Sequence, residues 1–191
     1  MDDTEPDVVS DTIRYRGKAV DDSEWIADFL TDGETGVLGL VDDDEPHLVT
    51  QLYVYDDETG AVYLHGAQAG RAYDVVAREG TTPGAFTVSE RGRFVPAEQP
   101  VNFTVEYASV VADGIVDLVD DAGEKRRVLE LFMDKFAPHL SPGEDYEPIA
   151  DDSVDRTAVY RFDVESWSGK RGEKAPDYPG AYDLESVSES Q

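Results

Sequence analysis

Three runs of β-branched, aromatic and other apolar residues lie close together in the first third of the chain, at residues 35–41, 47–55 and 61–65. The gaps between them, residues 42–46 and 56–60, are short and consist mostly of acidic residues, with a Pro in one and a Gly in the other. Short gaps of this kind favour hairpins between antiparallel strands. We therefore predict that an antiparallel sheet forms the centre of the fold.

Later segments add strands to this sheet. Residues 83–89 and 105–119 are rich in strand-forming residues, and Gly114 inside the second run predicts a bulge or a bend. Residues 154–167 alternate as a last strand. Because a closed or partly closed barrel leaves few exposed strand edges, we predict a mainly β fold, a six- to seven-stranded antiparallel barrel with flanking helices. The residues expected on one face of the last strand are Ala158, Tyr160, Phe162 and Val164.

Three segments have helical periodicity. The first begins with Ser23 as N-cap and ends at Gly33, the second spans residues 70–79, and the third spans residues 123–136. The apolar positions that define these helices are Trp25, Ile26, Phe29 and Leu30 in the first, Tyr73, Val76 and Ala77 in the second, and Val128, Leu131, Phe132 and Phe136 in the third.

The chain divides into one domain and two ends. Residues 1–12 are acidic and aperiodic, which predicts a flexible arm, and residues 171–191 carry Pro, Gly, Ser and acids, which predicts a disordered tail. Residues 13–170 form the domain.

Charge is the strongest feature of the composition. The chain of 191 residues has 43 Asp and Glu against 16 Lys and Arg, a formal net charge of −27, and only five lysines among its basic residues. Surface scaling gives roughly 9,000 Å² for a protein of this mass, so neighbouring carboxylates lie about 14–15 Å apart. The Debye length is about 10 Å at 0.1 M salt and about 3 Å at 1 M, so concentrated salt screens their repulsion. This composition is typical of salt-accumulating halophilic archaea; an acidic protein of an ordinary cytosol is the alternative.

The same composition excludes several functions. Nucleic-acid binding needs a basic surface, and an overall charge of −27 argues against one. No run approaches the ~18–20 apolar residues of a membrane span, and the acidic start lacks the basic region of a signal peptide. Without cysteine there is no disulfide or thiolate metal site. The three histidines have no metal-ligand spacing, so we predict no metal site and expect a soluble, cytoplasmic protein.

One segment combines features that suit a phosphate group. Residues 65–71 follow a predicted strand and enter a predicted helix, with Gly66 and Gly70 permitting close backbone approach and Arg71 adding a bidentate donor. The free N–H groups at a helix start favour anions. The alternative is a simple strand-to-helix turn with a surface salt bridge.

The order of motifs resembles that of a known family. Residues 48–55 and 62–71 are followed by residues 107–114, by Glu124-Lys125-Arg126 and by Trp167-Ser168-Gly169-Lys170. This succession resembles the FMN-binding split-barrel proteins related to pyridoxamine 5′-phosphate oxidase, and in particular the nitroimidazole-resistance subgroup. The resemblance extends from about Arg14 to Lys170.

The resemblance implies a flavin site and its residues. Residues 49–52 would lie along the flavin ring, residues 65–71 around the ribityl phosphate, and Ser109 beside a site shared by two protomers. Trp167 and Lys170 would close the pocket near the ring. Ala72 stands where relatives often have lysine, so phosphate affinity would rest on Arg71 and backbone donors. The implied cofactor-binding residues are Val49, Thr50, Gln51, Leu52, His65, Gly66, Ala67, Gly70, Arg71, Ser109, Trp167 and Lys170.

The function implied by this resemblance is a homodimeric FMN-dependent oxidoreductase acting on a small molecule. Two alternatives remain open: a deazaflavin-dependent reductase on the same barrel, and a non-catalytic flavin-binding protein. For His65 the resemblance implies a place in the cofactor pocket; a catalytic acid and a structural residue are its alternatives. No side chain is identified as catalytic from the sequence.

Overall fold

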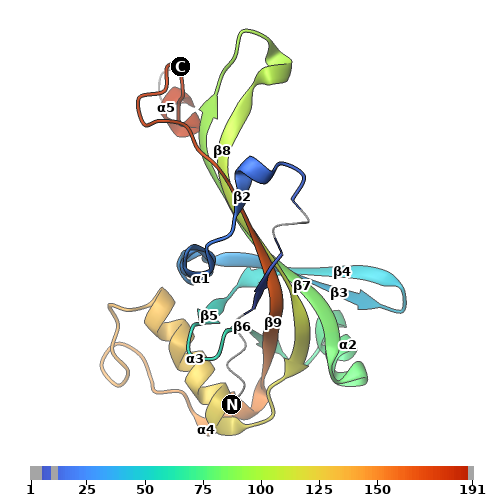
Figure 1. Cartoon of the computed structure of the whole chain (residues 1–191). Helices are drawn as coiled ribbons and strands as arrows, with labels where there is room; N and C mark the ends of the chain where they lie inside the picture. The colour runs from blue at the N-terminus through green and yellow to red at the C-terminus, as the bar shows by residue number, and fades with distance from the viewer. Residues whose placement is uncertain (1–5, 10–12, 189–191) are drawn as a thin grey trace.

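The computed structural model describes residues 6–9 and 13–188, and its centre is a strongly curved antiparallel sheet (Figure 1). The main path of the sheet runs β4-β3-β7-β8-β9-β6-β5, and the short strands β1 and β2 both pair with β9. The strands are β1 (Asp7–Val8), β2 (Ala19–Val20), β3 (Thr35–Asp42), β4 (Glu45–Leu52), β5 (Val54–Asp56), β6 (Ala61–Ala67), β7 (Thr82–Val95), β8 (Thr104–Leu118) and β9 (Thr157–Gly172).

Helices lie around this sheet (Figure 1). α1, α2 and α3 correspond to the three predicted helices, and the end of α1 at Gly33 is confirmed. The helices are α1 (Ser23–Asp32), α2 (Arg71–Glu79), α3 (Ala122–Phe136), α4 (Asp151–Arg156) and α5 (Leu184–Ser188), with 3-10 turns η2 (Arg16–Lys18) and η3 (Pro100–Asn102).

The two ends of the sheet path are joined by a single residue. β4 and β5 are separated only by Tyr53, yet β4 pairs with β3 while β5 pairs with β6. The Tyr53 hydroxyl donates to the Leu30 carbonyl at 2.7 Å, and the Tyr53 backbone N–H donates to the Glu34 carbonyl at 3.3 Å. The single strand predicted at residues 47–55 is therefore two strands, and the chain between them bends the sheet back on itself. The predicted mainly β, antiparallel barrel is confirmed.

The core lies between this curved sheet and two of its helices. Ile26 and Leu30 of α1 are fully buried against Phe86 and Phe162 of the sheet. A second apolar cluster lies under α3 and includes the buried Val128. The periodicity predicted for both helices is therefore the periodicity of their buried faces.

Three local predictions need correction. The N-cap of α1 is Asp22, not Ser23, because the Asp22 carboxylate accepts the N–H groups of Glu24 and Trp25. In α2 the buried pair is Val75 and Val76, whereas the predicted Ala77 is exposed. The strand predicted at residues 83–89 extends to Val95, because β7 continues past a bulge into a hairpin with β8 that projects beyond the barrel (Figure 1).

Gly114 marks a bulge, as predicted. The register of β8 with β9 shifts between Asp113 and Gly114. A Cβ on Gly114 would collide with the carbonyl oxygen of Asp163 on β9. Glycine is therefore required here for close approach of two backbones.

The predicted arm and tail are only partly described. Within the arm, Asp7 and Val8 form β1, which pairs in parallel with β9; residues 1–5 and 10–12 lie outside the described residues. Within the tail, Tyr182 pairs with Phe94 of β7 and stacks on its ring; residues 189–191 are also outside the described part. No helix of the described chain is long and apolar enough to cross a membrane.

Candidate functional site

A pocket of about 400 Å³ opens where the edge strand β4 faces the end of β6 and the start of α2. Seven of the residues predicted to bind a cofactor line it, and they come from these three elements and the turn before α2. Tyr160 of β9 also lines this pocket, and burial raises the pKa of its hydroxyl to about 12, so it stays protonated at neutral pH. The seven predicted residues are Val49, Thr50, Gln51, Gly66, Ala67, Gly70 and Arg71.

The turn into α2 leaves backbone donors facing the pocket. Gly70 has φ of 102°, a conformation that L side chains rarely adopt, and as N-cap it offers no side-chain acceptor. The N–H groups of the first turn of α2 are therefore not capped by the N-cap side chain. A Cβ on Gly66 or Gly70 would meet nothing within 4 Å. Open space beside two glycines and uncapped N–H groups form a cradle that suits an anion.

Arg71 is held at the mouth of this cradle by two carboxylates. Its Nε donates to Asp42 at the end of β3 at 2.8 Å, and its Nη2 donates to Glu45 at the start of β4 at 2.9 Å. Hydrogen bonds to Asp42 and Glu45 raise the pKa of the guanidinium. Arg78, about two turns further along α2, also binds Asp42, and together with Arg71 it lowers the pKa of that carboxyl. The Glu45 side chain is 76% exposed, so an incoming anion can replace it at little cost.

The edge strand β4 forms the opposite wall. β4 is the terminal strand of the sheet path, so its backbone groups on the side away from β3 face no other described strand. Val49 and Gln51 are half-buried, and Gln51 Nε2 donates to the His65 carbonyl at 3.4 Å. Leu48 and Leu52 are 68% and 48% exposed. Of the predicted run 49–52, only Leu52 is absent from the pocket lining.

His65 lies on β6 but its ring is directed to α3. The ring meets Phe132 edge-on at 4.5 Å between centroids, and desolvation lowers its pKa. Its side chain does not contribute to the pocket lining. Within one chain, the His65 ring therefore packs against Phe132, while the His65 carbonyl accepts a hydrogen bond from the Gln51 side chain.

Three predicted residues lie elsewhere on the sheet. Ser109 of β8 is directly opposite Lys170 of β9, and the Lys170 ammonium lies 5.2 Å from the centre of the Tyr107 ring. Trp167 is 2% exposed, and its indole N–H has no partner among the described residues. One chain alone therefore does not bring Ser109, Trp167 and Lys170 to the pocket of β4 and α2.

Comparison with known proteins agrees with this architecture. A family model described as pyridoxamine 5′-phosphate oxidase matches residues 22–171, most of the chain and every element around the pocket. The chain belongs to this family. No curated protein matches its sequence.

Solved structures of similar fold include flavin-binding proteins. The flavocytochrome Anf3 from Azotobacter vinelandii is 25% identical, with a TM-score of 0.74 over 96% of this chain and 82% of that one. A FAD and heme binding protein from Mycobacterium smegmatis is 19% identical, with a TM-score of 0.72 over 91% and 80%. A putative 5-nitroimidazole antibiotic resistance protein from Bacteroides thetaiotaomicron is 21% identical, with a TM-score of 0.62 over 80% and 86%. The predicted resemblance to the oxidase family and to the nitroimidazole-resistance type is confirmed.

Sequence reasoning missed the acidic residues that hold Arg71 beside the pocket of β4 and α2. The sequence predicts residues 42–46 only as a short acidic gap between strands, but Asp42 and Glu45 also hold Arg71 in place. The local sequence carries no sign of these ion pairs, because Glu45 and Asp42 precede Arg71 by 26 and 29 residues. Only the pairing of β3 with β4 beside α2 brings them together.

Proposed function

We propose that the pocket between β4 and α2 binds a flavin, FMN in the first place, and that the protein is a flavin-dependent oxidoreductase. The observation that carries this proposal is the cradle of Gly66, Gly70 and Arg71 at an uncapped helix start. Membership of the oxidase family supports it, and so do the flavin-binding proteins among the structures of similar fold.

In this proposal the chain binds and orients the cofactor. Arg71 and the first N–H groups of α2 hold the phosphate, and residues 49–52 of β4 offer backbone groups to the polar edge of the ring. The bound flavin supplies the hydride or electron transfer, while the protein supplies position and electrostatics. The neutral hydroxyl of Tyr160 offers a hydrogen bond at the pocket wall. We assign no side chain as catalytic acid or base.

We further propose that two copies complete the site. Ser109, Trp167 and Lys170 of β8 and β9 would approach the flavin held by the partner, as the family resemblance implies. The exposed apolar side chains of Leu48 and Leu52 on β4 and of Val111 on β8 support a contact surface for a second copy.

Two other cofactors are alternatives with distinct signatures. FAD is favoured by the relatives described as binding it, and a deazaflavin would use the same phosphate cradle. A chain that binds flavin without turnover is the third case. The substrate is a small molecule whose identity we leave open.

The test is the absorption spectrum of protein purified in molar KCl, followed by identification of the released cofactor by chromatography. We expect flavin bands at about one flavin per chain, with FMN in the extract. FAD, a deazaflavin with its own fluorescence, or a haem band would each select a different cofactor. A colourless protein that does not take up added FMN would contradict the proposal.

Replacing Arg71 tests the cradle directly. We expect Arg71→Ala to weaken FMN binding at least about tenfold, because it removes a charge-assisted, bidentate donor worth at least about 1.4 kcal/mol. The matched control is Arg156→Ala on α4, an exposed arginine whose ion pair with Asp152 is at 3.1 Å. Equal FMN affinity of the two variants, measured by fluorescence titration, would remove Arg71 from the site.

A further inference from the structure

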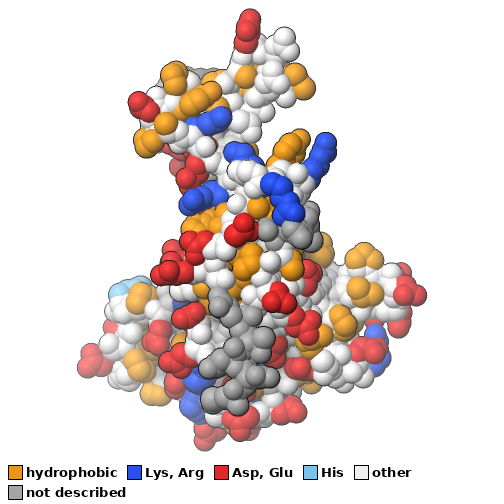
Figure 2. Space-filling view, viewed as in Figure 1, with side chains coloured by type: hydrophobic (Ala, Val, Ile, Leu, Met, Phe, Trp, Pro, Cys, Tyr) orange, Lys and Arg blue, Asp and Glu red, His pale blue; other side chains and the backbone are white. Residues whose placement is uncertain are grey.

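Basic side chains gather where the barrel meets the projecting β7–β8 hairpin. Figure 2 shows Lys and Arg over this narrow region, whereas Asp and Glu dominate the wider part below it. We call this region the basic neck; its cations come from the segment around η2, from β7 and from the end of β9. We include Arg14, Lys18, Arg91, Lys170, Arg171 and Lys174. The same segments also carry Arg16 and Arg93, and Arg93 pairs with Glu106.

Most arginines of the described residues are neutralised by carboxylates, but the six cations named for the basic neck are not. None of the six forms an ion pair with a carboxylate of the described residues, and five of them lie 5.1–5.4 Å from the centre of an aromatic ring. By contrast, six arginines outside the basic neck all have carboxylate partners: Arg71, Arg78, Arg126, Arg127, Arg156 and Arg161. In a chain with 43 acidic residues, a group of unpaired cations is a local positive field that attracts anions.

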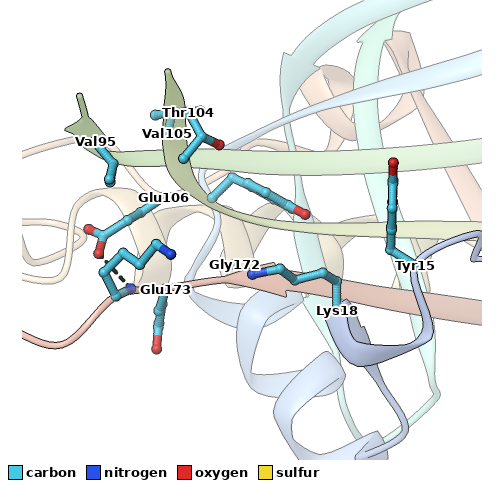
Figure 3. A pocket seen from close by; sticks show the side chains of 10 residues that line it. Tyr15, Lys18, Val95, Thr104, Val105, Glu106, Gly172 and Glu173 are labelled. Carbon is cyan, nitrogen blue, oxygen red and sulfur yellow. Dashed lines mark hydrogen bonds between the residues drawn. The ribbon is translucent and has the colours of Figure 1, made fainter. Parts of the chain in front are cut away.

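A cavity of about 330 Å³ opens into the basic neck (Figure 3). Lys18 and Lys174 line it, together with the rings of Tyr15 and Tyr107 and the apolar side chains of β7 and β8. A Cβ on Gly172 would stand 2.8 Å from the Tyr107 ring and 3.3 Å from Lys18 Nζ, so this glycine lets both approach the β9 backbone.

Two carboxylates line this cavity, and one of them is already neutralised. Glu106 accepts hydrogen bonds from Arg93 Nη2 at 2.7 Å, from Arg93 Nε at 2.8 Å and from the Lys174 backbone N–H at 2.8 Å. Figure 3 marks the last of these three bonds with a dashed line. The Arg93 guanidinium lowers the pKa of Glu106 to about 2, so this carboxylate stays charged and paired. Glu173 is the other carboxylate, and it is exposed. Among the described residues, neither carboxylate forms an ion pair with Lys18 or Lys174, so both ammonium groups are available to an external anion.

We propose that the cavity of the basic neck binds an aromatic anion of the mononucleotide class. Lys18 and Lys174 would hold the phosphate, and the rings of Tyr15 and Tyr107 with Val95 and Val105 would contact the base. The cavity volume lies at the lower end of the range for small-molecule sites, which suits one nucleotide better than two. Within one chain, no residue lining this cavity lines the pocket of β4 and α2.

The test is calorimetric titration of the full chain with AMP in 1 M KCl, where the Debye length of about 3 Å screens repulsion from remote carboxylates. We expect one saturable site per chain. Lys18→Ala and Lys174→Ala should each weaken AMP binding at least about fivefold, and the double variant at least about tenfold. The matched control is Lys125→Ala on α3, a lysine outside the basic neck that has no ion pair within the described part of the chain, and this variant should change the affinity less than about twofold. Circular dichroism checks that each variant is folded.

Related ligands and one further variant complete the test. Adenosine and inorganic phosphate should each bind at least about tenfold more weakly than AMP, because each lacks one half of the recognised chemistry. Absence of AMP binding up to about 10 mM would overturn the proposal, and so would inorganic phosphate binding as tightly as AMP. Loss of AMP binding in Arg71→Ala but not in Lys18→Ala would place AMP in the pocket of β4 and α2 and would also overturn it. Flavin content is read from absorbance on the same samples, so failure of this site is distinguishable from failure of the proposed flavin site.

Discussion

Gly66 is a strand residue whose missing side chain leaves room in the pocket. A Cβ there would meet nothing within 4 Å, and β-branched residues are well tolerated in strands. We therefore expect Gly66→Val to fold normally but to weaken FMN binding at least about tenfold, because its methyl groups would occupy the space that the cofactor needs. Fluorescence titration measures the affinity.

The matched control is Gly17→Val. Gly17 also has nothing within 4 Å of its Cβ position, but it lies in η2, outside the pocket. FMN affinity should be unchanged in this variant. If Gly66→Val binds FMN as tightly as Gly17→Val does, the turn before α2 is only structural.

His65 gives the protein a pH dependence of stability. Desolvation lowers its pKa from the ordinary value of 6.5, so the unfolded chain binds a proton more readily than the folded one. The stabilising contribution of neutral His65 is complete above pH 6.5 and is lost as pH falls from there toward the folded pKa. We expect urea unfolding to show a falling free energy between pH 7.5 and 5.5, and His65→Gln to flatten this slope. An equal slope in both proteins would contradict this role of His65.

At the residue scale, the sequence predicted which residues line the pocket better than how they are held. The glycines and Arg71 could be identified because their local spacing carries the chemistry of a phosphate site. The ion pairs of Arg71 with Asp42 and Glu45 could not, because they depend on tertiary contacts. The same limit applies to His65, whose ring contacts Phe132 from a distant helix.

At the scale of elements, the bulge at Gly114 tests why β8 and β9 are shaped as they are. A Cβ there collides with the Asp163 carbonyl, which belongs to a backbone and cannot move aside cheaply. We expect Gly114→Ala to lower the free energy of unfolding by about 1–3 kcal/mol. The same change at Gly66, where space is open, should alter it by no more than about 0.5 kcal/mol. Equal unfolding midpoints of the two variants in urea would show that β9 adjusts freely.

Elements with a local signal were predicted well. Helix α3 and strands β3 and β6 follow the predicted segments closely, because each has a clear period and a clear boundary. The division between β4 and β5 was missed, since it depends on Tyr53 reaching Leu30 of α1. The outer part of β7 was missed because the polar run Arg91-Gly92-Arg93 interrupts the strand pattern.

At the scale of the whole molecule, short acidic gaps and the order of motifs were enough to predict an antiparallel split barrel. They were not enough to predict the basic neck, whose cations come from segments about 75 and 155 residues apart that only the fold brings together. The net charge of −27 therefore conceals two opposite surfaces. On the face that Figure 2 shows, acidic side chains cover the barrel, and the basic neck is the exception.

The acidic surface leads to the last prediction, which concerns salt. At 0.1 M KCl the Debye length is about 10 Å, so carboxylates repel one another across the surface, and at 2 M KCl this repulsion is screened. We expect the free energy of unfolding at pH 7 to rise by at least about 2 kcal/mol between these concentrations, which corresponds to about 4–8 °C in the melting temperature. The control is the same comparison at pH 4, where many carboxyl groups are protonated and the gain should be smaller. A melting temperature that is equal at 0.1 M and 2 M KCl and pH 7 would show that carboxylate repulsion does not limit the stability of this fold.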